Sequence, residues 1–253
     1  MHIDSLGSGP DLVLIHGWAM HGGIFAPLTR LLRTRFRLHI VDLPGHGHSR
    51  DDAGALDPVA CAWRLVVRVP HAVWIGWSLG GLVALHAALD HAQHLRGLIE
   101  IAASPCFVAA PDWPLGVPLD TFTQFDAGLR TDYRATIERF LALEALGSDH
   151  AKAELRELRA HVFERGEPVL AALEQGMHLL ETTDLRARLS GLAVPNLWIA
   201  GRRDRLVPAA AMRWAAQRSP FGRFVEFSSG HAPFIGHAAE IADAVQAFAD
   251  TLP

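Results

Sequence analysis

The chain has 253 residues, half of them hydrophobic, and its 27 acidic and 23 basic residues give a formal net charge of −4. This length suits one large domain or one core domain with an insertion, and the acidic balance argues against a nucleic-acid partner. No apolar run approaches the roughly 18 residues of a membrane span, no signal-peptide pattern opens the sequence, and the two cysteines, Cys61 and Cys106, lack a metal-like spacing. We therefore expect a cytoplasmic protein in a reducing compartment, with no membrane partner.

Strand-like and helix-like segments alternate along the first part of the chain. Short apolar runs predict buried strands, and apolar residues at helical spacing predict helices between them. The predicted strands cover 12–16, 37–42, 72–76 and 95–103, and the predicted helices cover 24–33, 58–67 and 79–89. Repeated strand–helix–strand units favour a mostly parallel sheet covered by helices.

The strand signal disappears between about residue 105 and residue 186. Several prolines open this stretch, and helices are predicted at 132–146, at 150–163 and near 168–180. Strands resume at 194–201 and 223–228, and a last helix is predicted at 239–251. The simplest interpretation is an α/β core made of 1–108 and 187–253, interrupted by a helical insertion at 109–186.

The sequence Gly76-Trp77-Ser78-Leu79-Gly80 matches the pattern G-x-S-x-G between a predicted strand and a predicted helix. In that context the pattern indicates a nucleophile elbow, a tight turn that exposes Ser78 while the glycines let neighbouring backbone pass close by. The alternative is a glycine-rich turn with an incidental serine. A phosphate-binding loop is disfavoured because neither G-x-G-x-x-G nor a lysine-bearing P-loop is present.

An elbow serine needs a base and an acid, which follow it in the order Ser, Asp, His in hydrolases with this elbow. We predict His231 as the base, because it lies in a loop after a strand; His237 is the nearby competitor. We predict Asp204 as the acid that orients this histidine. The alternative for Asp204 is a surface ion pair with one of the neighbouring arginines, Arg202, Arg203 and Arg205.

Two backbone N–H groups should stabilise the oxyanion of the tetrahedral intermediate. We predict that Leu79, directly after the nucleophile, supplies one, and that Trp18 in the early loop His16-Gly17-Trp18 supplies the other. An ordinary strand-ending turn is the alternative for this loop, and His16 is expected to order it. His46 and His48 are expected to lie in a structural loop, because no third ligand stands at a zinc-like spacing, and no metal site is predicted.

Several motifs together resemble the α/β-hydrolase superfamily over the whole chain: HGW, DLPGHGHS, GWSLGG, GRRDRLVP and GHAPF. A closer resemblance is to the family of pimeloyl-ACP methyl ester esterases, the BioH carboxylesterases of biotin synthesis, through AASPCF, DWP, ERFLALEALGS, TDLR and GHAPFIGH. The resemblance implies an α/β-hydrolase fold with a helical lid and hydrolysis of the methyl ester of pimeloyl-ACP, releasing methanol without a cofactor. It places the triad on Ser78, Asp204 and His231. It places the substrate contacts on Trp18, Ser78, Leu79, Phe140, Leu141, Ala142, Leu143, Glu144 and His231.

The resemblance also implies that acyl carrier protein docks on a basic patch of the lid. Arg139, Lys152 and Arg156 match that patch here, while Ala135 replaces one expected arginine and has Arg134 beside it; Arg159 completes the predicted patch. Lys152, Arg156 and Arg159 share one helix face at i, i+4 and i+7. A solvated helix face is the alternative, because residues 130–165 hold seven basic and seven acidic residues.

Two other functions remain open at this point. One is a broad-specificity short-chain carboxylesterase or thioesterase with the same triad, and the other is a non-catalytic hydrolase fold that senses a ligand. Related dehalogenases and epoxide hydrolases are disfavoured because they need Asp, not Ser, at the elbow. A monomer is expected.

Overall fold

The computed structural model describes residues 1–252, and its centre is a seven-stranded sheet in the order β1-β3-β2-β4-β5-β6-β7. Only β1 runs antiparallel, pairing with β3, and the other neighbours are parallel. The strands are β1 (His2–Gly7), β2 (Asp11–Ile15), β3 (Arg37–Asp42), β4 (Ala72–Trp77), β5 (Leu95–Ile101), β6 (Asn196–Gly201) and β7 (Gly222–Phe227).

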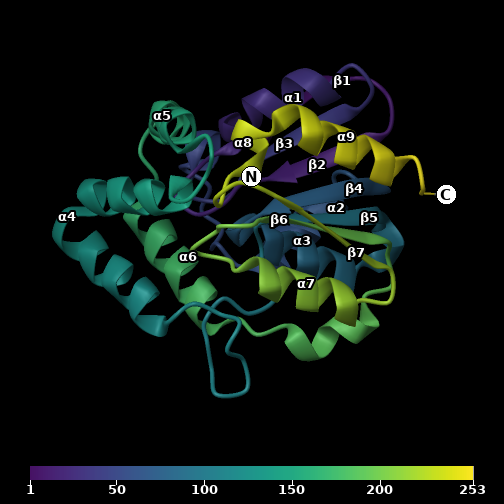
Figure 1. The fold of residues 1–253 in the computed structure, drawn as a ribbon. Coiled ribbons are helices and arrows are strands. Elements are labelled where there is room, and N and C mark those ends of the chain that lie inside the picture. Colours follow the sequence, from purple (N-terminus) through teal and green to yellow (C-terminus); the bar gives the residue numbers. More distant parts are fainter. Residues whose placement is uncertain (253) are drawn as a thin grey trace.

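Helices cover both faces of the sheet (Figure 1). Strands β4 and β6 are buried along their whole length, which explains their nearly continuous apolar sequences. Helices α1 and α9 pack together on one face, and α2, α3 and α7 lie on the other. The core helices are α1 (Ala26–Leu32), α2 (Pro58–Val66), α3 (Leu79–Asp90), α7 (Ala209–Arg218), α8 (Pro233–Gly236) and α9 (Ala238–Ala249), and short 3-10 helices are η1 (Gly22–Phe25), η2 (Gly47–Ser49), η3 (Ala92–His94) and η4 (Arg186–Gly191).

Three further helices, α4 (Leu119–Ala145), α5 (Ala151–His161) and α6 (Leu170–Thr182), lie between β5 and β6 in the sequence. They gather at one end of the sheet, on the left of Figure 1. The first and last segments of this insertion lie side by side. Leu185 N donates to Pro105 O at 2.8 Å, and the backbones of Cys106 and Asp184 form an isolated antiparallel β-bridge. We call this helical insertion the lid; its predicted limits at 109 and 186 stay a prediction.

The six predicted strands are present, and β1 was missed. None of its residues is fully buried, because an edge strand carries no continuous apolar face. Helix α7 and the first half of α4 were also missed. The latter kinks at Asp132, whose backbone is not helical and whose Oδ1 accepts from Ala135 N at 3.0 Å, so the predicted start at 132 marks a new turn rather than the first one.

Across residues 1–252, no helix is both long enough and apolar enough to cross a lipid bilayer. The described cysteines, Cys61 and Cys106, are buried and unpaired.

Candidate active site

The predicted nucleophile elbow joins β4 to α3. Ser78 has φ 53° and ψ −119°, a backbone conformation that side chains other than glycine rarely adopt and that usually marks a functional turn. The turn is closely packed, because a Cβ on Gly80 would lie 2.3 Å from Ile15 O and one on Gly76 would lie 2.5 Å from Gly81 Cα. Glycine is therefore required on both sides of the serine.

Ser78, His231 and Asp204 form a continuous hydrogen-bonded relay. His231 Nε2 lies 2.8 Å from Ser78 Oγ, and His231 Nδ1 lies 2.8 Å from Asp204 Oδ2. The three residues follow β4, β7 and β6, so parallel strands bring them to the same carboxyl edge of the sheet although the pairs are 153 and 27 residues apart. All three are buried, with exposed fractions of 3%, 1% and 7% for Ser78, His231 and Asp204.

Asp204 is held by its own loop rather than by an arginine. Its Oδ1 accepts hydrogen bonds from Leu206 N at 2.8 Å and Val207 N at 3.0 Å, which leaves Oδ2 directed to the imidazole. The neighbouring Arg202 and Arg203 pair with other carboxylates, on Glu226 and Asp149. The competing histidine, His237, lies against His150 and Phe227 and pairs with Glu240.

The loop that carries His231 is fastened to the lid. His231 N donates to Glu144 O of helix α4 at 2.8 Å, and His231 O accepts from Trp77 Nε1 at 2.8 Å. A Cβ on Gly230 would lie 2.5 Å from Glu144 O, so the lid helix touches the backbone of this loop. The backbone of His231, and with it the imidazole, is thus held by the lid through Glu144 and by the core through Trp77, the residue before Ser78.

The two predicted oxyanion donors belong to segments that lie next to the serine. Leu79 is the first residue of α3, where N–H groups have no partner within the helix and the helix dipole favours negative charge. The turn that contains Trp18 lies against the serine, because a Cβ on Gly17 would be 3.1 Å from Ser78 Cβ. Ala19 has φ 60°, so this turn is also tightly constrained. The oxyanion roles remain predictions that this packing favours.

His16 orders this turn, in agreement with the structural role expected for it. Its Nδ1 donates to Gly17 O at 2.7 Å, and its Nε2 accepts from Leu43 N at 2.9 Å, so the neutral ring is the form that fits. Burial, together with the nearby His46, lowers the pKa of His16 to about 3. Burial likewise lowers the pKa of His46 to about 4, with its Nδ1 donating to Pro44 O at 2.9 Å.

His48 lies close to His2 and Asp4, and their potential ligand atoms are all within 4.8 Å of one another. The sequence spacing did not indicate this group, because it is assembled from β1 and η2. The guanidinium of Arg165 already lies there, with Nη1 3.0 Å from Asp4 Oδ2 and 3.4 Å from His48 Nδ1. The positive charge at this group is therefore supplied by the side chain of Arg165.

The predicted substrate contacts on α4 do not share one environment. Phe140, Leu141 and Glu144 are buried, Leu143 is half-buried and Ala142 is exposed. The Phe140 ring packs on the Trp18 ring with centroids 4.7 Å apart, which places it beside the predicted oxyanion turn. Ala142 points away from this contact, and its substrate role stays a prediction without support from its exposure.

Glu144 is a buried acid beside the triad. Both of its carboxyl oxygens lack a hydrogen-bond partner among the described residues. Burial, with a smaller contribution from the charge of Asp204, raises the pKa of the Glu144 carboxyl well above its usual range. The neutral acid is therefore the form that fits this site.

Helix α6 also contacts the predicted site, which the sequence did not indicate. Trp18 Nε1 donates to Leu173 O at 2.9 Å, and a Cβ on Gly176 would lie 2.7 Å from Trp18 Cδ1 and 3.2 Å from Leu79 Cδ2. A glycine inside a helical pattern is a weak signal of such a close approach.

The predicted carrier-protein patch is only partly available. Arg134 pairs with Glu167, and Arg159 Nε lies 2.7 Å from Glu138 Oε2. Arg139 is exposed and donates to Thr136 Oγ1, while Arg156 is 77% exposed with a loose 3.9 Å contact to Glu157. Lys152 is exposed. Within residues 1–252, three of the five cations have no close ion pair: Arg139, Lys152 and Arg156.

A cavity of about 650 Å³ lies elsewhere, between the stem of the lid and α7, and no triad residue lines it. Its walls include Trp113, Arg186 and Trp214. The triad itself lies beneath the lid.

Comparison with known proteins identifies the family and the fold of this chain. A model of the alpha/beta hydrolase family matches residues 12–244. Among similar curated proteins is a "Pimeloyl-[acyl-carrier protein] methyl ester esterase" of Xanthomonas oryzae pv. oryzae (strain MAFF 311018), 55% identical over 254 residues and covered completely in both chains. A protein of the same description from Stenotrophomonas maltophilia (strain K279a) is 53% identical, covering 100% of this chain and 97% of the other. An esterase from Exiguobacterium antarcticum has the same fold, with a TM-score of 0.86 at 21% identity over 99% of this chain and 95% of the other.

Proposed function

This chain belongs to the alpha/beta hydrolase family, and from that premise we propose that it is a serine esterase that hydrolyses the methyl ester of pimeloyl-ACP. The observation that carries the proposal is the buried relay in which His231 contacts both Ser78 and Asp204 at 2.8 Å. The full-length identity of 55% to a protein described as pimeloyl-[acyl-carrier protein] methyl ester esterase supports the choice of substrate.

The relay supports acyl transfer through a covalent intermediate. His231 Nε2 takes the proton of Ser78 Oγ as that oxygen attacks the ester carbonyl carbon. The N–H groups of Leu79 and Trp18 stabilise the oxyanion, and Asp204 stabilises the imidazolium. Collapse of the intermediate breaks the bond to methoxide, which leaves as methanol with the proton from His231.

Water completes the reaction. His231 removes a proton from a water molecule as that water attacks the acyl-serine, and it returns the proton to Ser78 Oγ when the acid product leaves. Every proton is carried by the same imidazole, so this sequence of steps calls for no redox group or metal.

The lid supplies the environment proposed for the acyl chain and the carrier. Phe140 and Leu141 place apolar surface next to Trp18, which suits a chain of methylenes. The exposed cations Arg139, Lys152 and Arg156 suit an acidic carrier protein. In this proposal residues 1–108 and 187–253 carry the triad, residues 109–186 select the substrate, and one chain suffices as a monomer.

The test compares pimeloyl-ACP methyl ester with a short p-nitrophenyl ester. Wild-type protein is expected to hydrolyse the carrier-bound ester with the higher kcat/KM, and Ser78→Ala should lower kcat by about 10⁶-fold, because the nucleophile is lost. A fluorophosphonate should label the wild type and leave the variant unlabelled.

Each alternative has its own outcome. A preference for the short ester would favour the broad-specificity carboxylesterase or thioesterase. Absence of labelling and turnover in folded wild-type protein would favour the ligand-sensing fold. Near-normal turnover in Ser78→Ala would contradict the assignment of the nucleophile.

A further inference from the structure

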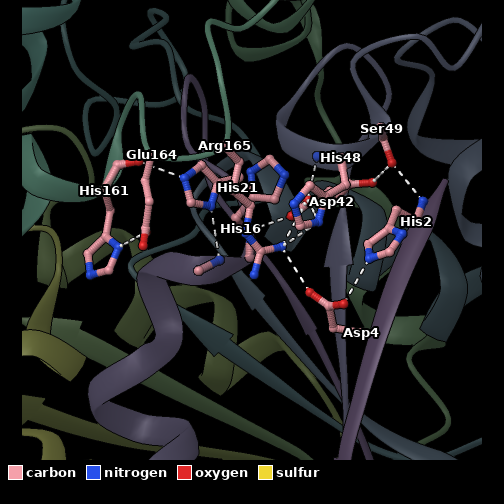
Figure 2. Close-up of polar contacts among 12 residues, drawn as sticks. His2, Asp4, His16, His21, Asp42, His48, Ser49, His161, Glu164 and Arg165 are labelled. Atoms are coloured by element: carbon pink, nitrogen blue, oxygen red, sulfur yellow. Dashed lines mark hydrogen bonds and ion pairs between the residues drawn. The ribbon is translucent and has the colours of Figure 1, made fainter.

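The lid touches the core at a second place, away from the His231 loop. This contact is the corner between α5 and α6, where the side chain of Arg165 extends toward the sheet (Figure 2). Arg165 Nη1 lies 3.1 Å from Asp42 Oδ2 and 3.0 Å from Asp4 Oδ2, and the side chain is only 18% exposed. A cation from the lid thus lies between carboxylates of β3 and β1.

Asp42 links this cation to the loop that carries the predicted oxyanion donor. Its side chain is fully buried; Oδ1 accepts from Gly22 N at 2.7 Å, and Oδ2 accepts from His48 N at 2.8 Å. Gly22 begins η1, directly after the segment 16–21 that contains Trp18. A buried carboxylate that loses its cation destabilises the folded state. Displacement of Arg165 should therefore disturb Asp42 and, through Asp42, the segment that it holds at Gly22.

A second contact joins the same two regions. His21 Nε2 donates to the carbonyl of His161, the last residue of α5, at 2.6 Å, and His21 Nδ1 accepts from Gly23 N at 3.1 Å (Figure 2). The lid corner is therefore fastened to residues 21–23 by a neutral hydrogen bond and, through Asp42, by an ion pair.

We propose that Arg165, Asp42 and His21 form a latch between the lid and the core. The latch couples the position of the lid corner to the geometry of the segment 16–23, which carries the predicted oxyanion donor Trp18. Arg165 is then a positioning residue for ester hydrolysis, since it acts on the loop through its ion pair with Asp42 rather than by touching the reacting atoms. The inference rests on the proposed esterase function for its kinetic consequence, while the structural coupling itself does not. Opening of the lid corner releases the 16–23 segment, and closing it restores the donor beside Ser78.

The test removes the cation and keeps the remainder of the chain. In Arg165→Gln, we expect hydrogen exchange to become faster both at the lid corner, 161–166, and in the segment 16–25, because the two regions lose their shared contact. We expect kcat on a short p-nitrophenyl ester to fall by roughly 10-fold, and KM for a long-chain methyl ester to rise, because both the loop and the lid are displaced. Arg165→Lys should recover part of both effects.

The matched control is Arg130→Gln, another lid arginine with loose surface ion pairs at 3.5 and 3.6 Å. It should leave exchange in 16–25 as in the wild type. If Arg165→Gln does not fold, Asp4→Asn removes the second carboxylate that pairs with Arg165, at a half-exposed site outside the latch, and should produce the same paired effects in weaker form.

The latch would be overturned if Arg165→Gln showed hydrogen exchange in 16–25 at the wild-type rate and kinetics equal to those of Arg130→Gln. Exchange that rises only at the corner would overturn the coupling. Because exchange and the short ester need no carrier, loss of the pimeloyl assignment would leave this test intact.

Discussion

Glu100 is a buried carboxyl placed beneath the elbow rather than beside the reacting atoms. It lies on β5 opposite Gly76, and a Cβ on Gly81 in the first turn of α3 would lie 2.3 Å from its Oε2. Neither carboxyl oxygen has a hydrogen-bond partner among the described residues, and burial raises the pKa of this group well above its usual range. The helix start favours an anion there, but the absence of partners makes the protonated acid the stable form.

The variant Glu100→Gln should therefore gain stability relative to the wild type as pH rises. A carboxyl whose pKa is higher when folded keeps its full contribution below the unfolded value, about 4.5, and loses it as pH rises toward the folded pKa. The neutral amide does not titrate, so the difference in free energy of unfolding should grow by up to about 1.4 kcal/mol per pH unit in that window. Urea unfolding at pH 5 and pH 8 measures it, and a difference independent of pH would contradict the prediction.

Helix α6 acts as a whole element on the predicted oxyanion turn. Its carbonyl at Leu173 accepts from the indole of Trp18, and Gly176 leaves the space that this indole fills. Phe140 of α4 packs on the same ring. Two lid helices thus determine where the Trp18 side chain lies, and with it the turn that holds the predicted backbone donor.

Gly176→Ala should lower both thermal stability and turnover. Alanine favours a helix by about 1 kcal/mol, but its Cβ would lie 2.7 Å from Trp18 Cδ1, and such overpacking costs about 1–3 kcal/mol. We expect a lower Tm and a fall in kcat of roughly 10-fold as the turn is displaced.

The control for this prediction is Gly191→Ala, because a Cβ at Gly191 meets nothing within 4 Å. This variant should match the wild type in kcat. Equal Tm and kcat for Gly176→Ala and Gly191→Ala would mean that α6 does not position the turn.

At the scale of the whole molecule, a chain with net charge −4 is proposed to bind an acidic carrier. Overall charge opposes this encounter, so the attraction must come from a small local group of cations. Internal ion pairs of Arg134 and Arg159 reduce that group further. The long-range part of the interaction should therefore be sensitive to salt.

We expect kcat/KM for pimeloyl-ACP methyl ester to fall by roughly 3- to 10-fold between low and high salt, while a short neutral ester shows a smaller change. The change Lys152→Glu should raise KM for the carrier-bound ester and flatten its salt dependence, because an exposed cation of the patch is reversed. Steady-state kinetics at several salt concentrations measure both effects. Equal salt dependence for the two esters would favour a solvated helix face without a carrier role.

Prediction from sequence succeeded where a feature is local. The strand–serine–helix order around Ser78 and the position of Asp204 and His231 just after strands are visible in short stretches, because parallel strands send their following loops to one edge. It failed where an element has no distinct pattern. Strand β1 has no continuous buried face, and the first half of α4 mixes polar and apolar residues before a break at Asp132.

The sequence alone determined the chemistry of this protein: the elbow with Ser78, the acid and base that follow it, and the alternation of strands and helices that carries them. Only the tertiary structure decided how the lid meets that chemistry. Three contacts join residues that lie far apart in the chain: Glu144 with the His231 loop, Gly176 with Trp18, and Arg165 with Asp42. The physical reason is that the triad depends on local turns and on the order of the strands, which short stretches of sequence predict. The packing of the lid on the core depends on contacts between distant side chains, which no short stretch of sequence predicts.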